Sequence, residues 1–138
     1  YIFSTKLIRI TDFLEVKNLE SVLTFLSRYA DNWSGGTKIG ECLQHFNRQY
    51  SKQAMTGKNM TIILSDGLDT GEPELLSKEL HKIKLRTRKL IWLNPLKGMK
   101  GYQPRTRGMV AALPELDHFM PAHNVNSLLE LENILSNV

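Results

Sequence analysis

Apolar residues recur at helical spacing in three stretches of the chain. They run over residues 19–26, over residues 39–50 directly behind a glycine loop, and over residues 76–83. Steps of three and four residues place such side chains on one face of a helix. Pro73 suits the first turn of the third helix. We therefore predict three amphipathic helices that pack against a core.

Other apolar runs have the pattern of strands. Residues 60–64 and 90–93 are nearly continuous in apolar side chains, as expected for parallel strands buried on both faces. Residues 1–4 and 7–10 are rich in β-formers and predict a hairpin at a sheet edge, and residues 118–120 predict one more short strand. Alternation of buried strands and amphipathic helices predicts the α/β class, with a mostly parallel, Rossmann-like sheet flanked by helices.

Two segments complete the pattern. Residues 95–108 contain glycine and proline and read as one loop, longer than most connections and therefore a candidate for function. Ser127 and Glu130 have the spacing of a capping box ahead of an apolar run, which predicts a terminal helix.

The composition indicates one domain spanning residues 1–138, with 41% hydrophobic and 23% charged residues. The single cysteine, Cys42, excludes an internal disulfide and indicates a reducing, cytoplasmic location. Its place on an apolar helical face predicts packing rather than nucleophilic chemistry. No apolar run approaches the roughly 20 residues that span a bilayer, so we expect no membrane span.

The net charge of +4 includes a basic run over residues 82–89, with Arg105 and Arg107 later. Cations at the end of a helix offset its dipole, and no aromatic-rich platform for base stacking accompanies them. We therefore expect no nucleic-acid partner.

Candidate chemistry gathers at two loop tips. Asp66 follows the buried strand 60–64, and in open parallel sheets ligands bind beyond the carboxyl ends of the strands. Gly67 allows a sharp turn there, and Asp69 shares the loop. Thr37 ends a glycine loop ahead of a helix, where free amides and a hydroxyl are expected. A hydroxyl and a carboxylate on neighbouring loops suit Mg²⁺, which takes oxygen ligands. Asp-Gly is also a common turn pair, so a purely structural loop is the alternative.

These motifs resemble part of the metal-ion-dependent adhesion site (MIDAS) of von Willebrand factor A (VWA) domains. Thr37 in Ser-Gly-Gly-Thr-Lys-Ile-Gly is similar to the second element, and Asp66 in Ile-Leu-Ser-Asp-Gly is similar to the third. Several longer segments resemble the CoxE-like branch of that superfamily: residues 90–95, 101–102, 107–109, 111–114 and 117–124.

The resemblance implies a site and a role. Thr37 and Asp66 would be metal ligands for Mg²⁺, or for Mn²⁺, in the full-length domain. The surrounding loop or second shell would comprise Ser34, Gly36, Ser65, Gly67 and Asp69. The implied role is that of a non-enzymatic protein-binding module. It would act with a MoxR-type AAA+ ATPase to mature a metalloenzyme, such as a molybdenum-containing carbon monoxide dehydrogenase or related hydroxylase.

The first MIDAS element, Asp-x-Ser-x-Ser, does not occur in these 138 residues. The resemblance therefore covers the C-terminal two-thirds of a VWA domain, a partial domain whose N-terminal central strand is absent. That strand would lie between residues 1–3 and 60–64, and its absence would separate the two edges by roughly 9 to 10 Å. We expect the chain either to close this gap by shifting its hairpin or to fold poorly and aggregate.

A second function is also open. The run from Asp66 to Thr70 superficially resembles the acidic strand-end motif of haloacid-dehalogenase-like enzymes, which suggests a metal-dependent phosphohydrolase of Rossmann-like fold. In that class one residue separates the paired aspartates, whereas two residues separate Asp66 from Asp69.

Overall fold

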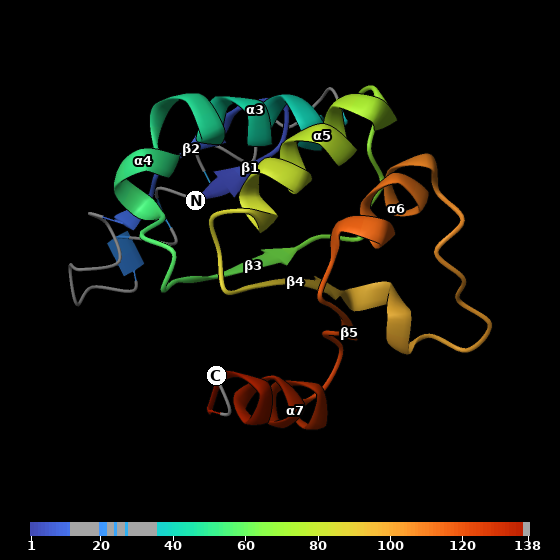
Figure 1. Ribbon diagram of the computed structural model, residues 1–138. Coiled ribbons are helices and arrows are strands. Elements are labelled where there is room, and N and C mark those ends of the chain that lie inside the picture. Colours follow the sequence, from blue (N-terminus) through green and yellow to red (C-terminus); the bar gives the residue numbers. More distant parts are fainter. Residues whose placement is uncertain (12–19, 22–23, 25–26, 28–35, 137–138) are drawn as a thin grey trace.

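Three parallel strands form the centre of the fold, with helices on both faces (Figure 1). The computed structural model describes residues 1–11, 20–21, 24, 27 and 36–136. The strands are β3 (Met60–Leu64), β4 (Lys89–Asn94) and β5 (His118–Pro121), in the order β3-β4-β5. This arrangement confirms the predicted α/β class and all three predicted strands.

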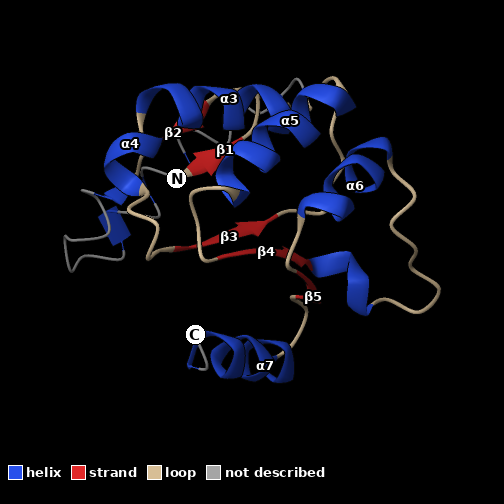
Figure 2. Ribbon diagram, in the orientation of Figure 1, coloured by secondary structure: helices blue, strands red, loops and turns tan. Residues whose placement is uncertain are grey.

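One face of the sheet is covered by most of the helices (Figure 2). These are α3 (Ile39–Gln49), α4 (Ser51–Ala54), α5 (Pro73–Lys84) and α6 (Arg107–Ala112), with the short 3₁₀ helix η2 (Leu113–Glu115) after α6. Their apolar sides meet those of β3 and β4 in the main core, as the helical spacing predicts. The buried residues of this core are Ile39, Leu43, Ile63, Leu76, Leu80, Ile83, Leu90, Trp92, Met109 and Ala112.

Helix α7 (Val125–Ser136) covers the opposite face of the sheet. Ile91, Leu93 and Met120 form a second buried cluster, against which Leu131 and Ile134 pack. The predicted capping box is wrong: α7 begins at Val125, and Asn124 Oδ1 accepts the backbone N–H of Ser127 at 2.9 Å. In the described part of the chain, no helix is long and apolar enough to cross a membrane.

Two other predictions change in detail. Residues 95–108 are not one continuous loop, because they contain the 3₁₀ helix η1 (Pro95–Gly98) and the first two residues of α6. Asn94 Oδ1 accepts the N–H of Leu96 at 2.8 Å and so caps η1. The helix predicted over residues 19–26 rests on Leu19, Val22, Leu23 and Leu26, which lie outside the described residues.

The predicted hairpin is present as β1 (Ile2–Phe3) and β2 (Leu7–Ile8), paired antiparallel. It forms a sheet of its own and does not join β3. The N–H of Lys38 donates to the carbonyl of Ser4 at 2.9 Å, which attaches the hairpin to the start of α3. A groove of about 720 Å³ separates it from β3. The chain was expected either to close the gap beside β3 by shifting its hairpin or to fold poorly and aggregate. In the described structure the hairpin does not close the gap.

The groove leaves one edge of β3 uncovered in the described structure. Ser65 N donates to Leu93 O at 3.1 Å, and Asn59 O accepts from Arg88 N at 2.8 Å, so odd-numbered residues face β4. Backbone groups alternate along a strand, and those of Met60, Ile62 and Leu64 therefore point into the groove. Such an unpaired edge is a template for pairing with another chain.

We expect Leu64→Lys to reduce self-association. Leu64 is 62% exposed beside the uncovered edge, where a lysine opposes edge pairing. The free energy of unfolding should change by only about 0.5 kcal/mol, because the side chain is outside the core. Light scattering and thermal unfolding measure the two effects. Leu85→Lys is the matched control, since Leu85 is 73% exposed at the end of α5 rather than on β3. An equal reduction by both variants would indicate an effect of net charge.

Candidate functional site

The two candidate loops meet at the carboxyl end of β3. Thr37 and Asp69 form an isolated parallel β-bridge. Thr70 strengthens it, because its backbone N–H and its hydroxyl both donate to the carbonyl of Thr37, at 2.8 and 3.1 Å. Gly36 (φ +73°) lies so close that a Cβ there would be 2.7 Å from Thr70 Cγ2. The Thr37 loop and the loop after β3, more than 30 positions apart in the sequence, are thereby held side by side.

Asp69 has a role that the sequence did not reveal. Its Oδ1 accepts the N–H of Ile39 at 2.9 Å and that of Gly71 at 3.1 Å, so it caps α3 from another loop. Lys38 at the N-cap position provides no side-chain cap, and Thr37 is not the cap. Asp69 Oδ2 is buried without a hydrogen-bond partner in the described structure. Asp69 therefore positions the Thr37 loop.

Asp66 sits in a tight local turn. Its Oδ1 accepts the N–H of Leu68 at 2.9 Å, and Gly67 adopts φ +77°, which favours glycine. Ser65 supports the turn, since its hydroxyl accepts the N–H of Gly67 at 3.1 Å and its carbonyl accepts Trp92 Nε1 at 2.9 Å. These bonds use one carboxylate oxygen of Asp66 and leave Oδ2 without a protein partner in the described structure.

Asn94, at the end of β4, holds the Asp66 loop through a hydrogen bond. It is fully buried, and its Nδ2 donates to the carbonyl of Asp66 at 3.0 Å and to the hydroxyl of Tyr102 at 2.9 Å. Burial raises the pKa of Tyr102, the hydrogen bond from Asn94 lowers it, and the charge of Asp66 raises it, for a net increase. Sequence reasoning missed this pair. A polar residue ending the strand beside β3 was the available signal, because parallel strands end at the same edge.

Helix α6 packs directly on the site loop. The hydroxyl of Thr106 donates to the carbonyl of Gly67 at 3.0 Å and accepts the N–H of Met109 at 3.2 Å. A Cβ on Gly108 would lie 2.8 Å from the Gly67 carbonyl oxygen, so this close approach requires glycine. The end of the segment predicted as a functional loop therefore braces the turn that holds Asp66.

The available donors can be compared with what Mg²⁺ requires. Thr37 and Asp66 both line the groove beside β3, and in the described structure neither the hydroxyl of Thr37 nor Asp66 Oδ2 has a protein partner. Both are hard oxygen donors, the kind that Mg²⁺ prefers. They are two of the about six oxygens that this ion takes. Among the described residues, no group of three or more His, Cys, Asp or Glu side chains could hold a metal. Ser34 lies outside the described residues.

Cys42 offers no second reactive centre. It is 2% exposed on the inner side of α3, and its thiol donates to the carbonyl of Ser4 at 3.5 Å. Burial, with a smaller contribution from the charge of Glu41, raises the pKa of this thiol to about 11. A thiol that stays protonated at neutral pH is a poor nucleophile, in agreement with the predicted packing role.

Comparison with known proteins identifies the family. Residues 1–128 match the family model described as VWA domain containing CoxE-like protein. No significant match was found among curated proteins or among solved structures. The family match covers most of the chain and agrees with the parallel α/β sheet, so the chain belongs to the CoxE-like VWA family.

Proposed function

We propose that the chain is a non-catalytic, metal-dependent protein-binding module. Mg²⁺, or Mn²⁺, would be held by Thr37 and Asp66, and a carboxylate of a partner protein would complete the coordination. The observation that carries the proposal is the bridge between the two loops, which brings a free hydroxyl and a free carboxylate oxygen to one groove. Water and further protein oxygens would supply the remaining ligands.

The family suggests the setting of this binding. A CoxE-like protein would act in the cytoplasm beside a MoxR-type AAA+ ATPase, holding a client metalloenzyme while the ATPase remodels it. The proposed client is a molybdenum hydroxylase such as carbon monoxide dehydrogenase. Arg105 and Arg107 are exposed on either side of Thr106, whose hydroxyl contacts the site loop. Their charges would attract an acidic partner surface toward Asp66.

The phosphohydrolase alternative is less well supported by the geometry. An enzyme with paired aspartates needs the second carboxylate to be available beside the first. Here Oδ1 of Asp69 is committed to the start of α3, and its Oδ2 is buried. We therefore expect no turnover of a generic phosphate ester in the presence of Mg²⁺.

The proposed function predicts metal-dependent association with the ATPase. In a pull-down with a purified MoxR-type ATPase, EDTA should release the complex, and added Mg²⁺ should restore it. Arg105→Glu with Arg107→Glu should weaken association, with little change in the thermal unfolding midpoint, because both side chains are exposed. Binding that is unaffected by EDTA would contradict the metal-dependent module, and measurable phosphatase turnover would favour the alternative.

A further inference from the structure

Among the described residues, positive charge is concentrated at the end of the sheet opposite the candidate site. Here the turn before β3 lies against the turn between α5 and β4: the N–H of Arg88 and the hydroxyl of Thr87 both donate to the carbonyl of Asn59, at 2.8 and 2.7 Å. We call this region the basic pole. Its cations are Lys52, Lys58, Lys82, Lys84, Arg86, Arg88 and Lys89.

The carboxylates beside the basic pole do not neutralise it. They are Glu79, Glu115 and Asp117, and each already has a partner. Among the described residues, the seven cations and three carboxylates of the pole give a formal charge of +4, whereas the other nine cations and eight carboxylates give +1. Most of the net charge of the described residues therefore resides at this end.

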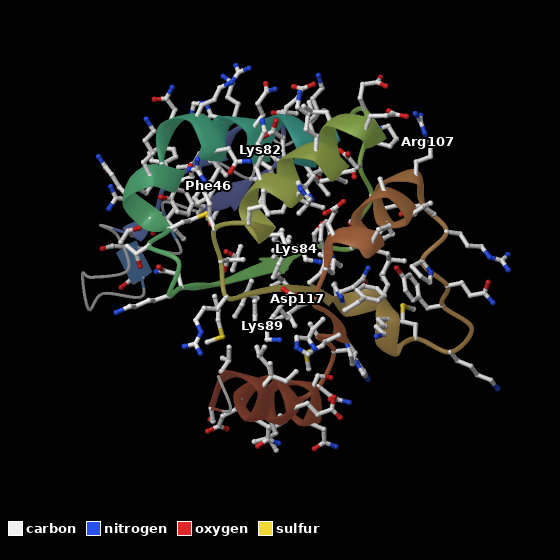
Figure 3. All side chains as sticks on the ribbon, viewed as in Figure 1. Phe46, Lys82, Lys84, Lys89, Arg107 and Asp117 are labelled. Carbon is white, nitrogen blue, oxygen red and sulfur yellow. The ribbon has the colours of Figure 1, made fainter. Side chains whose placement is uncertain are left out.

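Some of these cations are held in place, and others are free to bind. Arg86 donates to the hydroxyl of the buried Ser51 at 2.8 Å, and Lys84 lies 4.0 Å from Asp117 (Figure 3). In the described structure, four further side chains at the pole have no hydrogen bond or ion pair. These unpaired cations are Lys52, Lys58, Arg88 and Lys89.

An apolar residue projects among these charges. Leu85, at the end of α5, is 73% exposed, so most of this apolar residue lies in water. Burial of a leucine side chain is favourable, so contact with a partner at this position would add to binding. A surface that combines unpaired cations with one exposed leucine suits a ligand that carries both carboxylates and an apolar group.

The pole is less suited to a phosphate-bearing ligand. The backbone N–H groups of Leu85, Arg86 and Arg88 could help to cradle a phosphate, but all three already donate to protein carbonyls. The two turns also lack aromatic side chains, on which the bases of a nucleic acid would stack. A ligand that carries carboxylates can bind through the lysine and arginine side chains alone.

We propose that the basic pole docks an acidic segment of a partner protein, whose carboxylates pair with the unpaired cations while one apolar side chain packs on Leu85. The site at Asp66 lies at the other end of β3, roughly 16 Å away for a five-residue strand. The two surfaces can therefore be occupied at the same time, and binding at the pole does not require the metal.

The test measures binding of the 138-residue chain to a short fluorescein-labelled peptide of glutamates around one central leucine. Arg88→Glu with Lys89→Glu should weaken binding about tenfold or more, through repulsion of the glutamates. Leu85→Ser should weaken binding of this peptide but not of a version with serine in place of its leucine. Lys6→Glu with Lys100→Glu reverses two exposed lysines outside the pole, changes the net charge equally and serves as the matched control. Addition of EDTA should have no effect.

Several outcomes would overturn the proposal. These are an equal loss from the control pair, no effect of Leu85→Ser, and tighter binding at the same ionic strength to duplex DNA or to phosphatidylserine vesicles than to the peptide. Thermal unfolding of every variant separates loss of the surface from loss of the fold. EDTA should abolish association with the ATPase but leave peptide binding unchanged. Failure of the proposed function and failure of this proposal can therefore be told apart.

Discussion

Asp66→Ala is expected to weaken Mg²⁺ binding by the complete protein about tenfold or more, and to weaken metal-dependent ATPase association with it. Changes in the outer shell of a metal site already reduce affinity by about 10- to 100-fold, and a direct carboxylate ligand should matter at least as much. The fold should tolerate the change, because the side chain accepts only the exposed N–H of Leu68. We expect a loss of about 1 kcal/mol in the free energy of unfolding.

Two further variants separate charge from geometry in this prediction. Asp66→Asn preserves an acceptor for the N–H of Leu68 but removes the negative charge, so it should bind Mg²⁺ almost as poorly as Asp66→Ala. Thr37→Ala should have a milder effect, since a neutral hydroxyl is a weaker ligand than a carboxylate. Isothermal titration with Mg²⁺ and urea unfolding measure the two properties. Full metal affinity in Asp66→Asn would exclude Asp66 as a metal ligand.

The local pattern of the sequence was sufficient for most of the fold. Helical spacing of apolar residues correctly gave α3 and α5, because their inner faces are buried against the sheet, and continuous apolar runs gave β3 and β4. Helix ends were less predictable. Asn124 caps α7 where Ser127 had the expected spacing, since either residue can supply the accepting oxygen and only the path of the chain decides between them.

Long-range contacts account for what the sequence did not predict at the candidate site. Asp66 and Thr37 could be selected because each follows a simple rule about strand and helix ends. The cap that Asp69 provides to α3 joins residues 30 positions apart, and no local rule describes such a pair. The hydrogen bond from Asn94 to the Asp66 carbonyl likewise depends on the register of neighbouring strands.

Glu79 forms the most buried charged contact of the described structure, and it joins α5 to α3. Its side chain is fully buried, with Oε1 accepting from Lys82 Nζ at 2.6 Å and Oε2 from Asn47 Nδ2 at 2.8 Å. Burial raises the pKa of Glu79, but the hydrogen bonds from Lys82 and Asn47 and the charges of Lys82 and Lys78 lower it by more. The folded state therefore holds the proton less tightly than the unfolded chain does, and the ionised carboxylate stabilises the fold.

Glu79→Ala should reduce the free energy of unfolding at pH 7 by about 2–3 kcal/mol. It leaves a cavity and removes one of the two acceptors of Asn47 Nδ2, which keeps only the backbone carbonyl of residue 79 at 3.1 Å, while the half-exposed Lys82 can turn to water. Glu79→Gln keeps the shape of the side chain and should reduce the free energy of unfolding by less.

Because the folded pKa of Glu79 is lowered, its contribution to stability is fully present above the ordinary value of 4.5 and is lost as the pH falls through the folded value. In urea unfolding, the difference in the free energy of unfolding between wild type and Glu79→Gln should accordingly shrink below pH 4.5. Glu130→Gln changes an exposed glutamate on α7 and is the control for loss of one surface charge, with little change expected in the free energy of unfolding at pH 7. A difference for Glu79→Gln that stays constant with pH would show that shape, rather than the ionised carboxylate, stabilises this contact between the helices.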